Sequence, residues 1–157
     1  IAVRSTLDNQ RLIDALKEAS QSGVKIKMII RGICCILPGI EGKTDNIEVI
    51  SVVGRFLEHS RIFCFGTGEN MKMYIASADW MTRNTENRVE IAAPIYDQKI
   101  KNSIYDTLRI MWKDNLKARI LCSDGTYKKP EIKEGDELID CQNNLRHEYK
   151  VGRKIKL

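Results

Sequence analysis

Runs of apolar residues with two different spacings succeed one another along the chain, which is typical of a fold that alternates strands and helices. Residues 1–3 read as a strand cut from something longer. The next apolar positions recur with helical spacing, which predicts a helix that is capped by Thr6 or Asp8 and reaches Ser22. Residues 24–30 first alternate and then become wholly apolar, as a strand does when it enters a core.

Shorter elements follow in the same way, with turn residues between them. In order, they are a loop at 37–46, a strand at 47–50, a short helix at 51–58, strands at 62–65 and 71–77 joined by a turn at 66–70, a strand at 88–93 and a long helix at 97–116. This order implies the α/β fold class, as a sandwich in which helices flank a mixed β-sheet. Residues 125–157 are polar and sparsely apolar, so we expect an irregular tail that docks on a neighbouring domain or remains mobile.

The composition narrows the class of protein. A chain of 157 residues that is 43% hydrophobic and 30% charged fits one folded domain rather than a disordered segment. It has no apolar run near the ~20 residues that cross a bilayer, so we expect no transmembrane segment. The net charge of +5 is modest, which disfavours nucleic acid as a partner. That charge is compatible with a polyanionic phosphate substrate and equally with an ordinary basic protein.

Five cysteines occur at irregular spacing, with Cys34 next to Cys35. No C-x-x-C motif is present, so we expect neither zinc nor another bound metal at these residues. Free thiols are usual in a reducing compartment, and the pattern therefore favours a cytoplasmic protein. Peripheral association with a membrane stays open as an alternative.

Arg31 is the first residue that could carry chemistry, because it follows the apolar strand directly. Ligands of open α/β sheets gather at the carboxyl ends of strands, and a guanidinium offers a planar donor fork for phosphate oxygens. Gly32 would let a phosphate approach the backbone closely. The structural alternative is an ion pair between Arg31 and a carboxylate, since a buried guanidinium requires compensation.

His59 is the second candidate, because it lies between Arg55 and Arg61. Nearby cations favour the neutral imidazole, which can act as a base or a nucleophile. Glu58 or another carboxylate could hold the ring in place. The structural alternative is a histidine that only packs, which is the commoner role of a lone histidine.

A cluster of polar residues begins at the end of the strand predicted at 71–77. Its members are Ser77, Asp79, Arg83 and Asn84. The simplest interpretation is a capped turn with Asp79 as the N-cap. Arg88 and Glu90 would alternate to one face of the next strand, where they could form an ion pair, or Arg88 could contact phosphate. Trp80 and Trp112 are interpreted as packing residues.

Three segments, in this order, resemble one known family. They read RGICCILPGI from Arg31, GRFLEHSRI from Gly54, and IASADWMTRN from Ile75 with RVE after it. These motifs are similar to the carboxy-terminal domain of bacterial polyphosphate kinases, over a stretch from about Leu7 to at least Asp124. The resemblance implies a reversible transfer of the ATP γ-phosphoryl group to inorganic polyphosphate.

The resemblance also implies a domain organisation. Residues 1–124 would form a phospholipase-D-like domain, the last of four, and residues 125–157 the tail of the same domain. ATP or ADP, polyphosphate and the preceding domains would be partners, with a homo-oligomer as a further one. Mg²⁺ would accompany ATP and be bound mainly outside this chain. The histidine that becomes phosphorylated would lie in the preceding domain, so we expect the isolated fragment to be inactive.

For individual residues, the resemblance implies that Arg31 contacts the nucleotide phosphates and that His59 contacts ATP in a catalytic role, as an acid, a base or an accessory phosphoryl carrier. Arg61 and Arg88 would belong to the same ATP- and phosphate-binding site. No metal ligand is implied within this chain.

Two other classes of protein stay open. A phospholipase-D-like phosphodiesterase or nuclease would carry His-x-Lys, but this chain has His59-Ser60-Arg61. Gly66 stands where that class has an aspartate, and Ala76-Ser77 replaces its Gly-Ser pair. The altered motif fits phosphoryl transfer better than phosphodiester hydrolysis. The third class is a non-catalytic module that binds polyanions.

Overall fold

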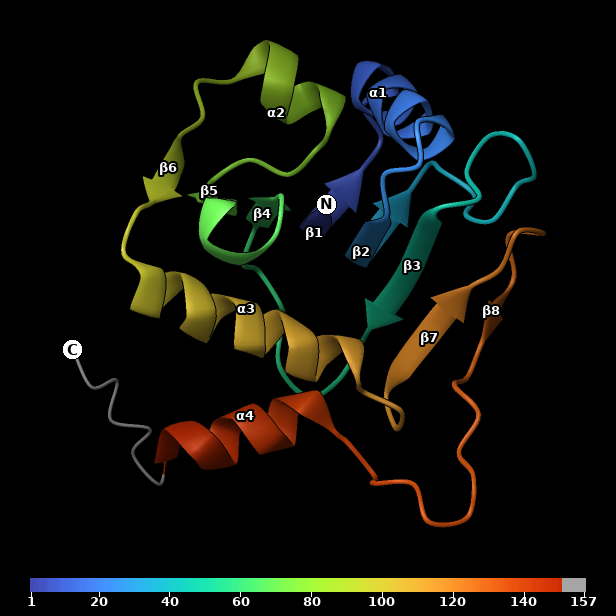
Figure 1. Ribbon diagram of the computed structural model, residues 1–157, viewed down its shortest axis with the longest axis vertical. Coiled ribbons are helices and arrows are strands. Elements are labelled where there is room, and N and C mark those ends of the chain that lie inside the picture. The colour runs from blue at the N-terminus through green and yellow to red at the C-terminus, as the bar shows by residue number, and fades with distance from the viewer. Residues whose placement is uncertain (151–157) are drawn as a thin grey trace.

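The computed structural model describes residues 1–150 of the chain, which form one sheet with helices on both faces (Figure 1). The elements in chain order are β1 (Ala2–Leu7), α1 (Gln10–Gln21), β2 (Ile26–Cys34), β3 (Ile47–Val52), β4 (Ile62–Phe65), the 3₁₀ turn η1 (Gly68–Asn70), β5 (Lys72–Ala76), α2 (Thr82–Asn87), β6 (Ala92–Ile95), α3 (Gln98–Trp112), β7 (Ala118–Leu121), β8 (Tyr127–Lys128) and α4 (Cys141–Lys150). The predicted α/β class with a mixed sheet flanked by helices is confirmed.

The sheet has eight strands in the order β6-β5-β4-β1-β2-β3-β7-β8. Its centre is parallel, because β1 pairs with β2 and β2 with β3 in the same direction. The strands on either side are antiparallel: β4, β5 and β6 follow one another on one flank, and β7 and β8 on the other. Parallel strands at the centre bring the carboxyl ends of β1 and β2 to one edge of the sheet.

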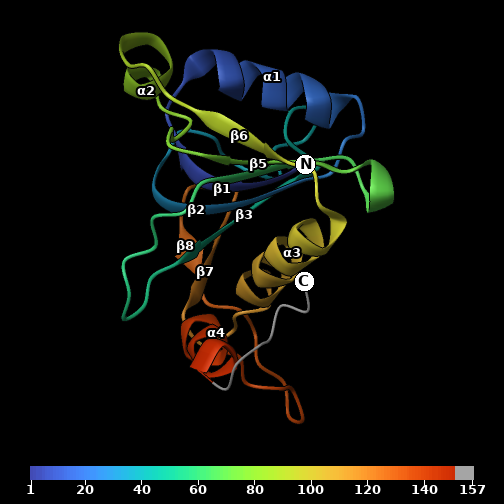
Figure 2. The same cartoon turned by 90° about the vertical axis from the view of Figure 1, so that its left-hand side faces the viewer.

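The sheet separates two apolar layers. Figure 2 shows α1 and α2 on one face, and α3 and α4 on the other. Successive side chains of β2 point to opposite faces, so this strand contributes to both layers. Met28 packs in the cluster that includes Ile13 of α1, whereas Ile29 packs in the cluster that includes Leu108 of α3. A strand that is apolar on both faces is expected at the centre of such a sheet.

Several predicted boundaries differ from those observed. The cap of α1 is Asn9, whose side chain accepts a hydrogen bond from the amide of Leu12 at 3.0 Å, and not Thr6 or Asp8. The strand predicted at 24–30 extends through Arg31 to Cys34. Here pairing with β1 across a register shift keeps the chain extended beyond its last fully apolar position.

The short helix predicted at 51–58 is wrong. Residues 51–52 complete β3, because Val52 pairs with Ala118 of β7, and 53–61 are irregular. The strand predicted at 88–93 begins later, at Ala92, and the long helix ends at Trp112 rather than near Leu116.

The irregular tail predicted for 125–157 is also wrong in part. Residues 127–128 pair as β8, and α4 begins at Cys141. The strand β7 was not predicted at all. Few positions of α4 are apolar, with Cys141 and Leu145 packed in the core, so its sequence carries little helical signal. Residues 151–157 of that prediction lie outside the described residues.

Two further expectations concern the state of the cysteines and membrane-spanning helices. All five cysteines are free thiols, as expected. Within residues 1–150, every helix is too short or too polar to cross a membrane.

Candidate functional site

The sheet topology collects the candidate residues at one edge. β1 and β2 end there, and β4, which runs antiparallel to β1, begins there directly after Arg61. β5 returns to the same edge and leads to Asp79. Residues that are far apart in the sequence, Arg31, Arg61 and Asp79, therefore meet at the position where open α/β sheets bind ligands.

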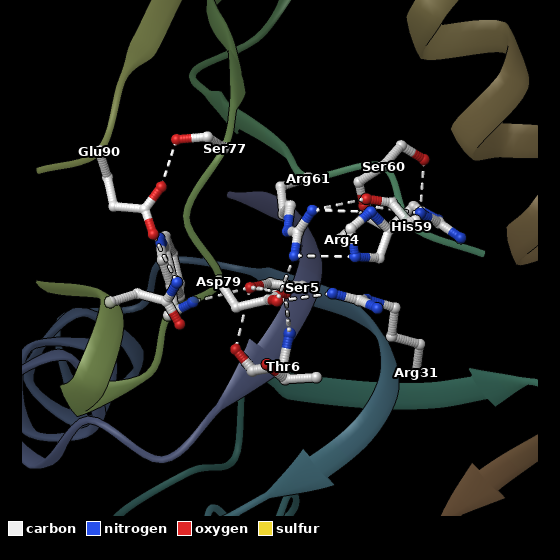
Figure 3. A network of polar contacts seen from close by, with 12 residues as sticks. Arg4, Ser5, Thr6, Arg31, His59, Ser60, Arg61, Ser77, Asp79 and Glu90 are labelled. Atoms are coloured by element: carbon white, nitrogen blue, oxygen red, sulfur yellow. Dashed lines mark hydrogen bonds and ion pairs between the residues drawn. The ribbon is translucent and has the colours of Figure 1, made fainter. Parts of the chain in front are cut away.

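Asp79 is the centre of the site (Figure 3). Its Oδ2 accepts a hydrogen bond from Nη2 of Arg31 at 2.5 Å and from Nη2 of Arg61 at 2.8 Å. Its Oδ1 accepts from the backbone amide of Thr6 at 3.1 Å and from the hydroxyl of Ser5 at 3.4 Å. Asp79 is only 3% exposed, so this carboxylate fixes two guanidinium groups from within the protein.

The charge state of Asp79 follows from these contacts. Burial alone would raise its pKa, but the hydrogen bonds and charges of Arg61 and Arg31 outweigh burial and lower the pKa of Asp79 to about 2. The carboxylate is therefore ionised at neutral pH, and the two arginines are only partly neutralised by one negative charge. This arrangement leaves a net positive site for an anion.

His59 lies beside this pair and is exposed. The guanidinium of Arg61 lies against both ring nitrogens, with Nη1 at 3.1 Å from Nδ1 and Nη2 at 3.2 Å from Nε2. A neutral imidazole has a single acceptor nitrogen, so only one of these contacts is a hydrogen bond. Arg61 thus links the imidazole to Asp79, because its Nη2 also donates to the carboxylate.

The expectation that Glu58 holds the imidazole is wrong. Glu58 instead forms an ion pair with Arg4, whose Nη2 lies 2.5 Å from Oε2. Nη1 of Arg4 donates to the carbonyl and the hydroxyl of Ser60, at 2.6 and 2.5 Å. Arg4 is 1% exposed and was missed by sequence reasoning. The available signal was a charged residue directly after the apolar residues 1–3 of a predicted strand, since a buried arginine requires counter-groups.

The glycine after Arg31 serves packing between strands. A side chain at Gly32 would approach Cγ2 of Thr6 at 3.2 Å, which is tighter than usual contacts. Within residues 1–150, the Nε groups of Arg31 and Arg61 are buried and have no hydrogen-bond partner. A cavity of about 310 Å³ borders Arg31, and its other lining residues are Val52, Val53, Gly54, Phe56, Leu57 and Glu58. Space therefore lies next to Arg31, one of the two paired arginines.

Ser77 and Glu90 form a second polar cluster nearby. The hydroxyl of Ser77 donates to Glu90, which also accepts from Nδ2 of Asn84 at 2.6 Å. These hydrogen bonds, first from Ser77 and then from Asn84, lower the pKa of Glu90. Arg88 is exposed and follows α2 directly. Neither Arg88 nor Glu90 lies in β6, so the predicted placement of this pair on one face of that strand is wrong. The charge of Arg88 adds, after these hydrogen bonds, to the lowering of the pKa of Glu90.

The capped turn predicted after Ser77 is also corrected. α2 begins at Thr82, and the carboxylate that accepts a hydrogen bond from its amide, at 2.7 Å, belongs to Asp8. Asp79 was misassigned because its partners are distant in sequence. Trp80 stacks on Phe63 with the ring centroids 4.9 Å apart, which confirms its packing role.

The donor set does not fit Mg²⁺. Among residues 1–150, no group of three or more histidine, cysteine, aspartate or glutamate side chains comes close enough to hold a metal ion. Asp79 and Glu58 are each engaged by a guanidinium, and a second cation beside them would face that positive charge.

Comparison with known proteins identifies relatives of the chain. The family described as "Polyphosphate kinase C-terminal domain 2" matches residues 1–142. A polyphosphate kinase of Bacillus anthracis is 48% identical over 145 residues, which are 92% of this chain and 20% of that protein. The polyphosphate kinase of Rhodopirellula baltica is 40% identical over 154 residues, which are 98% of this chain and 18% of that protein.

The fold has a solved counterpart. The crystal structure of polyphosphate kinase from Porphyromonas gingivalis matches with a TM-score of 0.87 and 34% sequence identity, over 96% of this chain and 23% of that chain. The chain thus spans about a fifth of the length of these relatives.

Proposed function

Because this chain belongs to the polyphosphate kinase family as its carboxy-terminal domain, we propose that it binds the phosphates of ATP and polyphosphate for the family's transfer reaction. The whole enzyme would reversibly move the γ-phosphoryl group of ATP to the end of a polyphosphate chain. One observation carries the proposal: Arg31 and Arg61 share the single carboxylate of Asp79 and have His59 beside them.

Each residue has a role in this proposal. Arg31 and Arg61 neutralise phosphate oxygens with the donors that Asp79 does not use, which is the main requirement of phosphoryl transfer. Asp79 holds the two guanidinium groups at the orientation that this binding needs. His59 acts on the transferring phosphoryl group, as a proton carrier or accessory acceptor. Arg88, exposed beyond α2, contacts phosphates at the rim of the site.

Mg²⁺ accompanies the nucleotide in this proposal, and other parts of the longer enzyme hold it. Within the described residues the chain offers guanidinium groups and an imidazole, not a set of carboxylates. Its contribution is therefore to bind and orient anionic oxygens and to exchange a proton at His59.

Other domains of the longer enzyme would complete the site. Val53 and Leu57, which line the cavity next to Arg31, are 70% and 87% exposed. Exposed apolar side chains around a polar site suit contact with another protein surface. We assign the domain to the phospholipase-D-like class and the enzyme to the cytoplasm, with assembly into a homo-oligomer as a further expectation.

The decisive experiment is His59→Gln in the full-length enzyme. Because general acid–base or nucleophilic groups contribute about 10²–10⁴-fold to turnover, kcat should fall by that factor while the melting temperature stays within a few degrees. His147→Gln is the matched control, since His147 is the other histidine of the 157-residue chain and is exposed on α4. A His59→Gln enzyme that is destabilised but fully active per folded molecule would overturn the catalytic assignment.

A further inference from the structure

We propose that Gln142 and Arg4 are positioning residues that hold the backbone on either side of His59, an inference that rests on the function proposed for this histidine. His59 lies in the irregular segment 53–61 between β3 and β4. An exposed irregular segment has many conformations, and a catalytic group needs a fixed one. Contacts from Gln142 and Arg4 fix the conformation of this segment.

Gln142 contacts the segment from the first turn of α4. Its Oε1 accepts from the amide of Phe56 at 2.9 Å, and its Nε2 donates to the carbonyl of Phe56 at 2.8 Å. The same Nε2 donates to Oε1 of Glu58 at 2.8 Å. Gln142 is 6% exposed, so these hydrogen bonds are shielded from water. A single side chain thereby satisfies both backbone groups of one loop residue, as a paired strand would.

Arg4 contacts the same segment from β1. Gln142 and Arg4 together form a clamp that holds the segment from two sides. It binds the other oxygen of Glu58 through Nη2 and both oxygens of Ser60 through Nη1. Glu58 and Ser60 are the two neighbours of His59 in the sequence, so the residues on both sides of the histidine are tethered to buried groups, Glu58 through its carboxylate and Ser60 through its carbonyl and hydroxyl. Figure 3 shows Ser60 and His59 next to Arg4. The imidazole itself is left at the surface, against Arg61.

Gly54 provides independent support for the clamp. A Cβ atom at this position would lie 2.5 Å from Oε1 and 2.8 Å from Cδ of Gln142. Only glycine therefore leaves space for the Gln142 side chain in its observed position. Gly54→Ala would displace the amide group of Gln142 without removing any hydrogen-bonding group from the protein.

The kinetic test uses Gln142→Glu in the full-length enzyme. The substitution keeps the shape of the side chain but replaces its donor by a carboxylate that faces Glu58 and the carbonyl of Phe56. We expect kcat to fall by about 10- to 100-fold, the scale of a misplaced catalytic group, and the KM for ATP to change by less than about twofold. Gly54→Ala should lower kcat in the same direction, and Asn144→Ala, an exposed position on the same helix, should not.

A double variant separates positioning from general stability. If Gln142 acts through His59, Gln142→Glu should lower kcat little further in an enzyme that already carries His59→Gln. Effects that multiply, or an unchanged kcat in Gln142→Glu, would overturn the inference. A melting temperature that falls while kcat per folded molecule is kept would assign Gln142 to stability alone.

A structural measurement tests the clamp without relying on the function proposed for His59. In the 157-residue chain, ring signals of His59 are assigned in NMR spectra by removing the other histidine with His147→Asn. Gln142→Glu and Gly54→Ala should shift or broaden the His59 signals, whereas Asn144→Ala should leave them in place. Unchanged signals would overturn the clamp whatever the kinetics. A clear shift in the chain, combined with full activity of the His59→Gln enzyme, would instead overturn the proposed function.

Discussion

Asp79 illustrates how a single residue organises the site. The sequence places it after a strand, where an aspartate usually caps the following helix, and this interpretation was wrong. Its partners are Arg31, on β2, and Arg61, directly before β4, which approach it only through the pairing of the sheet. Arg31 and His59 were recognisable as site residues because Arg31 directly follows an apolar strand and His59 lies between two arginines. Their carboxylate partner was not, because local spacing says nothing about contacts between distant strands.

Asp79→Asn tests this ion-pair network through its dependence on pH. The pKa of Asp79 is about 2 in the folded chain and near the ordinary ~3.9 when unfolded, so its charge stabilises the fold above pH ~4. That contribution, roughly 2 kcal/mol, is lost as the pH falls through ~4 towards 2. We expect Asp79→Asn to lower the free energy of unfolding by about 3 kcal/mol at pH 7, since it leaves two partly buried guanidinium groups without their counter-charge.

The measurement is urea unfolding of both chains from pH 7 to pH 2.5. The difference in the free energy of unfolding between the two chains should narrow as the wild-type carboxylate becomes protonated. Asp14→Asn is the control, because Asp14 is mostly exposed and its removal should change stability by less than about 0.5 kcal/mol. A gap that stays constant across this range would mean that the charge of Asp79 does not stabilise the fold.

Among the secondary-structure elements, the connection from α3 to β7 explains the clearest boundary error. The apolar period continues past Trp112, and sequence reasoning therefore extended the helix to about 116. Asp114, 2% exposed, instead accepts hydrogen bonds at Oδ1 from the amides of Leu116, Lys117 and Ala118, at 3.1, 2.6 and 3.0 Å. A buried carboxylate that takes three successive amides turns the backbone into β7 and ends the helix.

The same side chain also fixes the start of α4. Oδ2 of Asp114 accepts from the amide of Cys141 at 2.8 Å. Burial would raise the pKa of Asp114, but the hydrogen bonds from Cys141, Lys117 and Ala118 lower it. Strands such as β4 and the turn after it were predictable from a local apolar run and from glycines. β7, β8 and α4 were not, because contacts of this kind, rather than their own patterns, define them.

Asp114→Asn should therefore loosen three elements at once. The substitution keeps the size of the side chain but turns one acceptor oxygen into a donor that faces a backbone amide. We expect the free energy of unfolding to fall by about 2 kcal/mol, the scale of an unsatisfied buried hydrogen bond to a charged group. Urea unfolding measures this loss. Asp106→Asn, at a partly exposed position of α3, is the control and should change stability by less than about 0.5 kcal/mol; equal losses in the two variants would contradict the role given to Asp114.

For the molecule as a whole, the predictable part was a mixed sheet with a strand that enters the core, and the structure adds its parallel centre. Apolar runs predicted β2, and parallel pairing with β1 places Arg31 at the same edge as Thr6. Antiparallel flanks then bring in Arg61 and Asp79. The architecture concentrates positive charge at one edge, next to a cavity whose apolar rim is exposed. The described residues therefore form one side of an open site and do not enclose it.

The last prediction follows from that incomplete site. The chain spans about a fifth of the length of its relatives, and its described residues bring two arginines and a histidine together but no cluster of metal ligands. We expect the isolated 157-residue chain to shift its His59 ring signals when ATP is added, because the guanidinium groups are already in place. It should nevertheless show no turnover with ATP, Mg²⁺ and polyphosphate under conditions in which the full-length enzyme works. Turnover near the ~1–100 s⁻¹ of ordinary kinases would show that this domain alone holds all catalytic groups, and the site would then need no other domain.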